Sequence, residues 1–391
     1  MSSASVQTPI APAPATDHLA RVFAQYPFEV VRADGVWLED REGRRVLDYY
    51  GGHAVAALGY GHPRWVAALE KQAREVLFQT NAIPMAVRER AAARLVRFAG
   101  LGLDSVFFVN SGAEANENAL RLAFKLTGRR AAVALEHGWH GRTAAAGAVT
   151  HGAREKWYGF PRAPFDVRFI SRTDPTAVAA IGADTACVIV EPVQGLAGAF
   201  EVPVEVLRAL RRRCTEVGAM LIFDEVQCGV GRTGAPFAAN RAGVVPDVIT
   251  AAKALGAGFP VSAMLLSPAI AARLSIEDMG TTFGGGPLAC AIVETVIDII
   301  ESEGLLENVG RMSALIRSSC ITGPVTAIQG AGLLLGLRTT RPAKEVQKEL
   351  LAAGIFAGTA ADPYILRLLP PFTLQEPHVA QLAETLGRLP P

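Results

Sequence analysis

The segment MLIFDE, at residues 220–225, is the clearest indication of the fold class. Four apolar residues run without alternation into two acids, which is typical of a strand buried on both faces of a sheet. Similar runs occur at 106–110 (VFFVN), 187–191 (CVIVE) and 247–252 (DVITAA), and a strong helix former follows at 113–126. Strands that alternate with helices predict βαβ units and a mostly parallel sheet, so the expected fold class is α/β.

Helical periodicity covers further parts of the chain. Apolar residues recur at helical spacing over 62–78. Another helix is expected over 203–217, because Pro203 stands near its start and Gly218 just past its end, where each residue is favoured. These segments supply the connections that a parallel sheet needs.

The sequence changes character after Pro287. Two long helical stretches, at 288–303 and 306–319, accompany shorter strand-like runs at 332–338 and 364–369, which is typical of a smaller α+β domain. The expected parts are a disordered leader, an N-terminal segment that packs with the small domain, a large cofactor-binding domain and a small C-terminal domain, at residues 1–25, 26–60, 61–287 and 288–391.

The composition excludes several classes of function. With 38 basic and 37 acidic side chains, the chain has no charge excess for a nucleic-acid backbone. No run reaches the ~18 apolar residues of a membrane-spanning helix, and the N-terminus lacks the pattern of a signal peptide. No nucleic-acid or membrane partner is therefore expected. The five cysteines are widely spaced and form no CxxC pair, which favours reduced thiols in a cytoplasmic protein.

Three of the predicted strands end in groups that can carry chemistry, at the sheet edge where open α/β sheets bind ligands. The first run leads into Ser111-Gly112-Ala113 at a helix start, where free N–H groups and the helix dipole favour an anion. The second ends in Asp224 and Glu225, which suit a protonated ring nitrogen. The third leads to Lys253, whose apolar neighbours disfavour the ammonium and free the amine to attack a carbonyl.

Each of these features also has an ordinary structural explanation: an N-cap serine, an ion pair, or a lysine that extends its ammonium into solvent. The combination is more specific. A phosphate site, a carboxylate and an imine-forming lysine at successive strand ends are the groups that pyridoxal phosphate requires. The lysine holds the aldehyde, the carboxylate keeps the pyridine nitrogen protonated and the helix end holds the phosphate.

Two other motifs carry less weight. GVGRTG at 229–234 matches the dinucleotide pattern GxGxxG, but that pattern must open a helix, and residues 235–237 (APF) form helix poorly. A dinucleotide-dependent oxidoreductase, the alternative from another class of enzyme, is therefore disfavoured. His137 and His140 lie three residues apart without a third ligand nearby, so no metal site is expected.

Longer motifs extend the pattern. They include GVWLEDREGRRVLDYYGG, FVNSGAEANENALRLA, WHGRT, VIVEPVQG, LIFDEVQCGVGRTG, ITAAKALGAGFPVSAML, TTFGGGPLACA and LRLLPP. Through them the chain resembles the class III (ornithine-type) pyridoxal-phosphate aminotransferases, most closely the acetylornithine branch, from about Phe28 to Leu374. The resemblance implies a pyridoxal-phosphate-dependent transferase fold of type I, with a large domain built on a mostly parallel sheet plus a smaller α+β domain. It also implies a homodimer with shared active sites.

The resemblance assigns expected roles to individual residues. The catalytic residues would be Lys253, which binds the cofactor aldehyde and moves protons, and Asp224, which pairs with the ring nitrogen. The other cofactor contacts would come from Gly112, Ala113, Trp139, Glu225, Val226, Gln227 and Thr282, the last reaching the phosphate of the partner subunit. The substrate contacts would come from His53, Arg142, Thr281 and Arg367.

Several positions depart from the family pattern. Trp139 stands where Phe or Tyr is usual, Gly286 replaces an asparagine, and His53 replaces an aliphatic residue or a tyrosine. Leu196 is the most consequential, because the family normally carries a glutamate there that can pair with the arginine matched by Arg367. Without that glutamate, Arg367 would attract α-carboxylates throughout the cycle, and selectivity for a terminal amine would fall.

The expected activity is a ping-pong transfer of the terminal amine of N-acetylornithine, or of a similar ω-amino acid, to 2-oxoglutarate. The products would be a semialdehyde and glutamate. The sequence leaves ornithine, succinylornithine, 4-aminobutyrate and a carrier-linked lysine open as donors. A non-transaminating pyridoxal-phosphate enzyme, such as an aminomutase or a decarboxylase, is a further alternative on the same scaffold.

Overall fold

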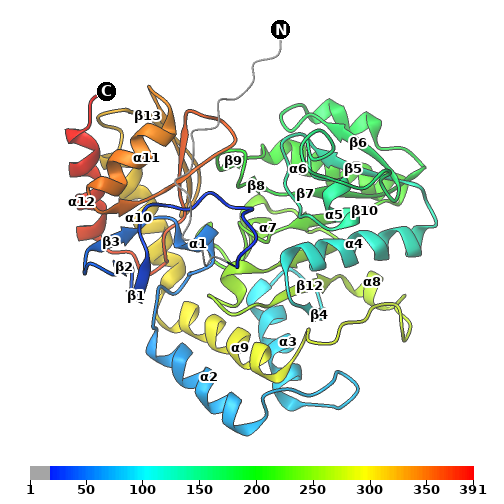
Figure 1. The fold of residues 1–391 in the computed structure, drawn as a ribbon. Helices are drawn as coiled ribbons and strands as arrows, with labels where there is room; N and C mark the ends of the chain where they lie inside the picture. Colours follow the sequence, from blue (N-terminus) through cyan, green and yellow to red (C-terminus); the bar gives the residue numbers. More distant parts are fainter. Residues whose placement is uncertain (1–17) are drawn as a thin grey trace.

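A seven-stranded sheet forms the centre of one part of the molecule in the computed structural model, which describes residues 18–391 (Figure 1). Its strands are β4 (Ser105–Val109), β5 (Ala131–Leu135), β6 (Asp166–Ile170), β7 (Thr185–Val190), β10 (Met220–Asp224), β11 (Val248–Ala251) and β12 (Ser262–Leu266). They lie in the order β4-β12-β11-β10-β7-β5-β6, and every strand except β12 points the same way. The mostly parallel sheet is thus confirmed, with the four apolar runs as β4, β7, β10 and β11.

The apolar runs lack alternation because both faces of the sheet are covered. The longer helices are α2 (Pro63–Glu75), α3 (Ala86–Ala99), α4 (Gly112–Thr127), α6 (Val204–Val217), α9 (Pro287–Ser302), α10 (Leu305–Ser319), α11 (Ala343–Ala352) and α12 (Glu376–Arg388). Leu221 and Phe223 of β10 belong to one buried cluster, together with residues of α3, α6 and α9. Met220 and Ile222 belong to a second cluster, together with residues of α4.

The sequence prediction omits β5, β6 and β12. β5 is AAVAL, in which small residues give a weak hydrophobic signal although every one of them is buried. β6 is an edge strand that carries Asp166 and Arg168. β12 lies inside an apolar stretch, 261–274, that is too short to span a membrane. Its first part forms this buried strand, which is antiparallel to β11. No helix within residues 18–391 is long and apolar enough to cross a membrane.

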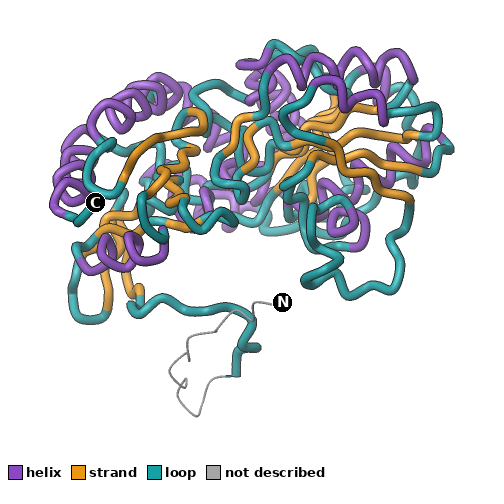
Figure 2. The backbone as a smooth tube through the Cα atoms, turned by 90° about the horizontal axis from the view of Figure 1, so that it is seen from above, coloured by secondary structure: helices purple, strands orange, loops and turns teal. Residues whose placement is uncertain are grey.

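The C-terminal part contains an antiparallel sheet. Its strands are β13 (Val325–Ala331), β14 (Leu334–Thr339), β16 (Gly358–Thr359) and β17 (Ile365–Leu368), in the order β13-β14-β17-β16. The expected helices at 288–303 and 306–319 are confirmed as α9 and α10, and the strand-like runs as β14 and β17. Figure 2 shows the strands of the two parts as separate groups, each flanked by helices.

The N-terminal strands join the C-terminal part. β1 (Val30–Asp34), β2 (Trp37–Asp40) and β3 (Arg45–Asp48) form antiparallel pairs, and β3 pairs in parallel with β15 (Ile355–Phe356). Residues 18–29 contain no helix or strand. Most of the leader expected over 1–25 lies outside the described residues.

Helix α9 links the two parts, because it packs on α2 and α3 although it begins at the expected boundary between the domains. The remaining elements are short: α1 (Gly51–Ala54), α5 (Ala144–Ala148), η1 (Pro175–Ala180), β8 (Val193–Gln194), β9 (Phe200–Glu201), α7 (Ala238–Ala242), η2 (Lys253–Leu255) and α8 (Pro268–Ala271). Several of them lie in the connections between the strands of the large sheet, where the candidate site is found.

Arg232 of the GVGRTG loop also ties distant segments together. Its side chain is fully buried and donates to the carbonyl oxygens of Leu333 (3.1 Å), Pro370 and Ala54 (3.4 Å). Its guanidinium lies 4.5 Å from the ring centre of Phe372, and burial lowers the pKa of Arg232 to about 9. The loop opens no helix, so it serves here as a structural clamp between the N-terminal segment, the large sheet and the C-terminal part.

We expect Arg232→Met to destabilise the protein by about 2–4 kcal/mol, because buried carbonyl groups lose their donors. Urea unfolding followed by circular dichroism measures this change. Arg212→Met is the matched control: Arg212 is exposed, and its replacement should change the free energy of unfolding by less than about 0.5 kcal/mol. Equal effects of the two substitutions would contradict the clamp.

Candidate active site

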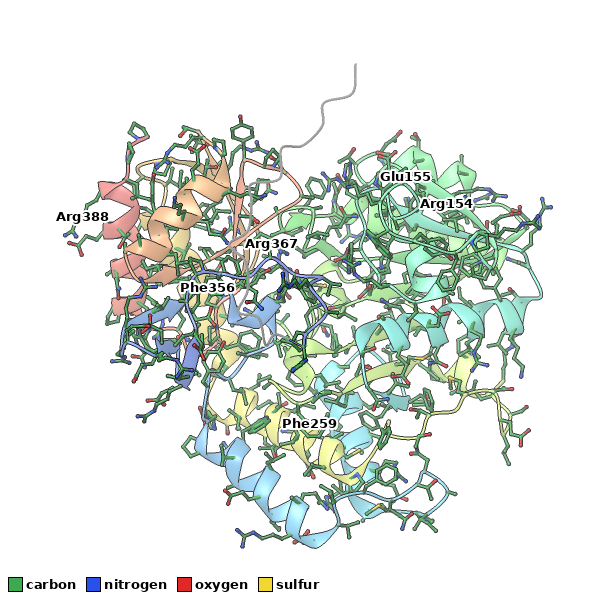
Figure 3. All side chains as sticks on the ribbon, viewed as in Figure 1. Arg154, Glu155, Phe259, Phe356, Arg367 and Arg388 are labelled. Carbon is green, nitrogen blue, oxygen red and sulfur yellow. The ribbon has the colours of Figure 1, made fainter. Side chains whose placement is uncertain are left out.

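A cavity of about 890 Å³ lies beyond the carboxyl ends of the parallel strands. The three strand ends singled out from the sequence meet there, and other segments complete the wall. The lining includes His53, Asn110, Ser111, Gly112, Ala113, Trp139, His140, Arg142, Trp157, Glu191, Leu196, Asp224, Val226, Gln227, Lys253, Phe259 and Arg367. Figure 3 shows Arg367 between the two parts of the molecule. The cavity therefore combines the large sheet with residues of the N- and C-terminal parts.

Asp224, the last residue of β10, is a buried carboxylate with three donors. Its Oδ2 lies 2.7 Å from Asn116 Nδ2 and 2.8 Å from His140 Nδ1, and its Oδ1 accepts from the backbone N–H of Val226 (3.1 Å). Thr250 on the neighbouring strand β11 donates to Asn116 Oδ1 (2.7 Å) and so fixes the amide. This network holds the carboxylate in one orientation.

Lys253 stands two residues beyond β11, at the start of η2, with a left-handed backbone φ of 45°. Among residues 18–391 its amine takes part in no hydrogen bond or ion pair. Desolvation lowers the pKa of Lys253, although the charges of Asp224 and Glu191 act in the opposite direction. A lowered pKa favours the neutral amine, which is the form that acts as a nucleophile or as a base.

The start of α4 forms another part of the wall. Ser111 is the N-cap, and its Oγ accepts from the backbone N–H of Glu114 (3.2 Å). The cap explanation of this serine is therefore correct. The preceding N–H groups, of Gly112 and Ala113, belong to the first turn, whose donors have no intrahelical acceptors. Because both residues line the cavity, this helix end can receive an anion.

Glu191 and Gln227 add polar groups to the cavity. Glu191 accepts from the backbone N–H of Trp139 (2.7 Å) and Gly195 (3.2 Å). Burial, reinforced by the charge of Asp224, raises the pKa of Glu191 to about 7. Gln227 Oε1 is buried, and among the described residues it has no hydrogen-bond partner. A Cβ on Gly195 would come within 1.6 Å of that oxygen, so only glycine permits this approach.

Arg367 on β17 is only 3% exposed and has neutral partners alone. It donates to the carbonyl oxygens of Thr359 (2.7 Å) and Gly195 (3.2 Å) and to Tyr50 Oη (3.3 Å). Burial lowers the pKa of Arg367. In the described part of the chain no carboxylate forms an ion pair with this guanidinium, and Leu196 lines the cavity next to Gly195. The charge of Arg367 is therefore available to a ligand.

Arg142 contacts two aromatic rings. Its guanidinium carbon lies 5.2 Å from the ring centre of Trp139 and 4.6 Å from that of Trp157. The two indoles are themselves 5.2 Å apart. Both distances from the guanidinium fall within the ~6 Å range of a cation–π interaction. Trp139 had been expected in the site, whereas Trp157 had not.

His53 lies in a turn of left-handed residues. The backbone φ is 67° at His53 and 68° at Ala54, a conformation that costs about 1 kcal/mol for a residue with a side chain. The imidazole ring centre is 4.7 Å from that of Tyr50. Burial, together with the charges of Arg367 and Lys253, lowers the pKa of His53. Protonation of this imidazole is therefore disfavoured by its surroundings.

Three expected site residues do not line the cavity. Glu225 turns away from it: its carboxylate accepts from the backbone N–H groups of Ala238 and Ala239 (2.8 Å) and so caps α7. The expected contact of Glu225 with the cofactor stays a prediction that its side-chain carboxylate does not support. Thr281 donates to Glu114 (3.3 Å), and Thr282 is exposed.

Asn116, His140, Glu191 and Trp157 were missed in the sequence as site residues. Asn116 lies about one helical turn after Gly112, a spacing that could have placed it near the strand ends. His140 had been weighed only as a metal ligand, but its Nδ1 faces Asp224. Within residues 18–391 no group of three or more His, Cys, Asp or Glu residues could hold a metal ion.

Comparison with known proteins identifies the family. The family described as aminotransferase class-III matches residues 19–389, so the chain belongs to the class III aminotransferases, which depend on pyridoxal phosphate.

Among curated relatives, an acetylornithine aminotransferase of Streptomyces coelicolor is 42% identical, covering 92% of this chain and 90% of its own. One of Mesorhizobium japonicum is 38% identical, covering 95% and 94%. The solved acetylornithine aminotransferase of Elizabethkingia anophelis superposes with a TM-score of 0.84 at 28% identity, covering 95% and 96%.

The free energy of unfolding of the protein should depend on pH through the carboxyl group of Glu225. Burial raises the pKa of Glu225 from 4.5 to about 7. Between pH 4.5 and pH 7 the folded state keeps a proton on Glu225 that the unfolded state has lost. The free energy of unfolding therefore falls as the pH rises through this range, and above about pH 7 Glu225 causes no further change.

We expect Glu225→Gln, which has no such proton, to gain about 2–3 kcal/mol of stability relative to the wild type between pH 5 and pH 8. Urea unfolding of both cofactor-saturated proteins at the two pH values measures it. Glu205→Gln, at an exposed position, should stay within about 0.5 kcal/mol of the wild type. The expectation fails if the difference between Glu225→Gln and the wild type is the same at both pH values.

Proposed function

We propose that this enzyme transfers the terminal amine of N-acetylornithine to 2-oxoglutarate and releases N-acetylglutamate semialdehyde and glutamate, a step of arginine biosynthesis. The observation that carries the proposal is the presence, in one cavity, of the free amine of Lys253 and two guanidinium groups without acidic partners among residues 18–391, those of Arg142 and Arg367. The names of the curated relatives support the choice of donor.

The cavity fits pyridoxal phosphate, whose aldehyde takes up the amine and whose protonated ring withdraws electrons from the bond that is broken. The free amine of Lys253 would hold the aldehyde, and the N–H groups of Gly112 and Ala113 would hold the phosphate. Val226 and Trp139 would contact the two faces of the ring. The unpartnered Oε1 of Gln227 would accept the proton of the ring hydroxyl.

Asp224 and Lys253 would carry the proton chemistry. The hydrogen bonds from Asn116 and His140 keep the carboxylate of Asp224 in place, so it would stabilise a proton on the ring nitrogen. The amine of Lys253 would also act as the base that takes up and returns the proton of the donor carbon. Its lowered pKa favours the neutral base.

The two arginines would bind carboxylates, because a guanidinium can hold a carboxylate through two parallel hydrogen bonds. Arg142, at an exposed position of the cavity, would bind the α-carboxylate of N-acetylornithine, and Arg367 that of glutamate or 2-oxoglutarate. His53 and Thr281 would lie beside the substrate. We infer that the same residues serve both half-reactions of a ping-pong cycle.

We propose that two copies of the chain form a homodimer with shared active sites and act in the cytoplasm. Apolar side chains near the cavity support the dimer: Phe78, Ile83 and Phe283 are 41%, 48% and 67% exposed. The rings of Phe78 and Phe283 are 5.4 Å apart. Thr282 lies next to this surface and would reach the phosphate bound by the partner subunit.

A donor panel with 2-oxoglutarate, read out as glutamate formed, tests the proposed reaction. We expect the highest kcat/KM for N-acetylornithine, above ornithine, succinylornithine, 4-aminobutyrate and a carrier-linked lysine. A higher kcat/KM for any of these donors would replace the assigned substrate. The absence of glutamate with all of them would refute the reaction.

Leu196 offers a test of how Arg367 affects selectivity. A glutamate at position 196 would place a carboxylate near Arg367 and compete with α-carboxylates of the donor. We expect Leu196→Glu to raise the ratio of kcat/KM for N-acetylornithine to kcat/KM for alanine by about threefold or more, since a partly desolvated charge pair contributes about 1 kcal/mol. Leu196→Gln, which has the same shape without the charge, should leave the ratio unchanged; an unchanged ratio in both variants would remove Leu196 from the account of selectivity.

A further inference from the structure

Arg142 lines the cavity, and its side chain is held there by aromatic rings. The residue is exposed, and within the described chain it makes no hydrogen bond and no ion pair. Its guanidinium carbon instead contacts two indole rings, at 5.2 Å for Trp139 and 4.6 Å for Trp157. A long side chain at an exposed position normally samples many rotamers, and fixing it costs about 1.5–2 kcal/mol. The rings are therefore the groups that restrict this guanidinium.

Trp157 is held in place independently of the cofactor region. It belongs to a turn after α5, in which its backbone N–H donates to the carbonyl oxygen of Ala153 (2.9 Å). The next residue, Tyr158, is buried against Ala148 and Ala153 and donates to the carbonyl oxygen of Ala144. This packing fixes the turn that carries Trp157, whose indole lies 4.6 Å from the guanidinium carbon of Arg142 and 5.2 Å from the indole of Trp139.

An aromatic partner has a different consequence from an acidic one. A carboxylate would orient Arg142 but would also neutralise it and compete with an incoming carboxylate. An indole orients the guanidinium through its ring quadrupole and leaves the N–H groups at the edge of the guanidinium plane free to donate. The arrangement preserves the full charge and the donor pair for a ligand.

We propose that Trp157 is a positioning residue that determines specificity for donors with a carboxylate, because it holds Arg142 ready to bind that group. This inference rests on the proposed binding of the donor carboxylate by Arg142. Trp139 would be occupied with the cofactor ring, whereas Trp157 is free for this role. Loss of Trp157 weakens the binding of a carboxylate-bearing donor and leaves the chemistry at Lys253 intact.

The test compares two donors on the holoenzyme. N-acetylornithine carries the carboxylate, and N-acetyl-1,4-diaminobutane has the same amine and amide without it. For Trp157→Leu we expect the KM for N-acetylornithine to rise about threefold to fivefold, the upper part of the range for a cation–π contact at an exposed site, with kcat within about twofold of the wild type. The kcat/KM for N-acetyl-1,4-diaminobutane should stay within about twofold. Trp157→Phe, which keeps an aromatic face, should recover most of the affinity.

Phe160→Leu is the matched control, because Phe160 is exposed on the same segment, contacts Tyr158 and does not line the cavity. It should match the wild type with both donors. Equal losses of Trp157→Leu with both donors would assign Trp157 a structural role only, and an unchanged KM for N-acetylornithine would exclude any role; either result overturns the proposal.

Failure of the proposed function is distinguishable from failure of this inference. If the wild type does not use N-acetylornithine but the donor panel finds another carboxylate-bearing donor, the same comparison is made with that donor and its decarboxylated analogue. A selective rise in KM for the carboxylate-bearing member would then support Trp157 while the assigned substrate is replaced.

Discussion

The burial of a carboxylate at the end of β10 is the constraint on which the site depends. Asp224 is only 3% exposed, and a buried charge requires donors. Asn116 from α4, His140 from the segment after β5 and the backbone of Val226 supply them. Three connections of the sheet must therefore converge on one residue, and the same convergence brings the start of α4 and Lys253 to the cavity. The parallel sheet and the site are consequences of one packing arrangement.

The cavity keeps its positive groups free. Lys253, Arg142 and Arg367 form no ion pair with any carboxylate of residues 18–391, although all three line the same space. Neutral oxygen acceptors hold Arg367 and aromatic rings hold Arg142, whereas desolvation lowers the pKa of Lys253 and so favours its neutral amine. Neutral and aromatic partners orient a cation without competing for its ligand. This distribution suits an enzyme that binds carboxylate substrates in two successive half-reactions.

Local sequence was informative where a segment has one dominant physical property. The long apolar runs became buried strands, and Lys253, Asp224 and the start of α4 were recognised because strand ends meet at one edge of a parallel sheet. Prediction failed for β5, whose alanines have little hydrophobic signal, and the sequence did not indicate that the carboxylate of Glu225, adjacent to Asp224, points to α7. Successive residues after a strand point in different directions, and the sequence does not say which one faces the ligand.

The fold class, the family and the presence of Lys253 and Asp224 in one site were all predictable from the sequence, because they depend on periodicity and on motifs that are continuous in the chain. Only the tertiary structure decided what surrounds them. Asn116 lies 108 residues from Asp224, Gly195 lies 172 from Arg367, and Trp157 meets Arg142 through a packed turn. Hydrogen bonds and cation–π contacts act over a few ångströms in space, so partners this far apart in the chain become known only when the fold brings them together.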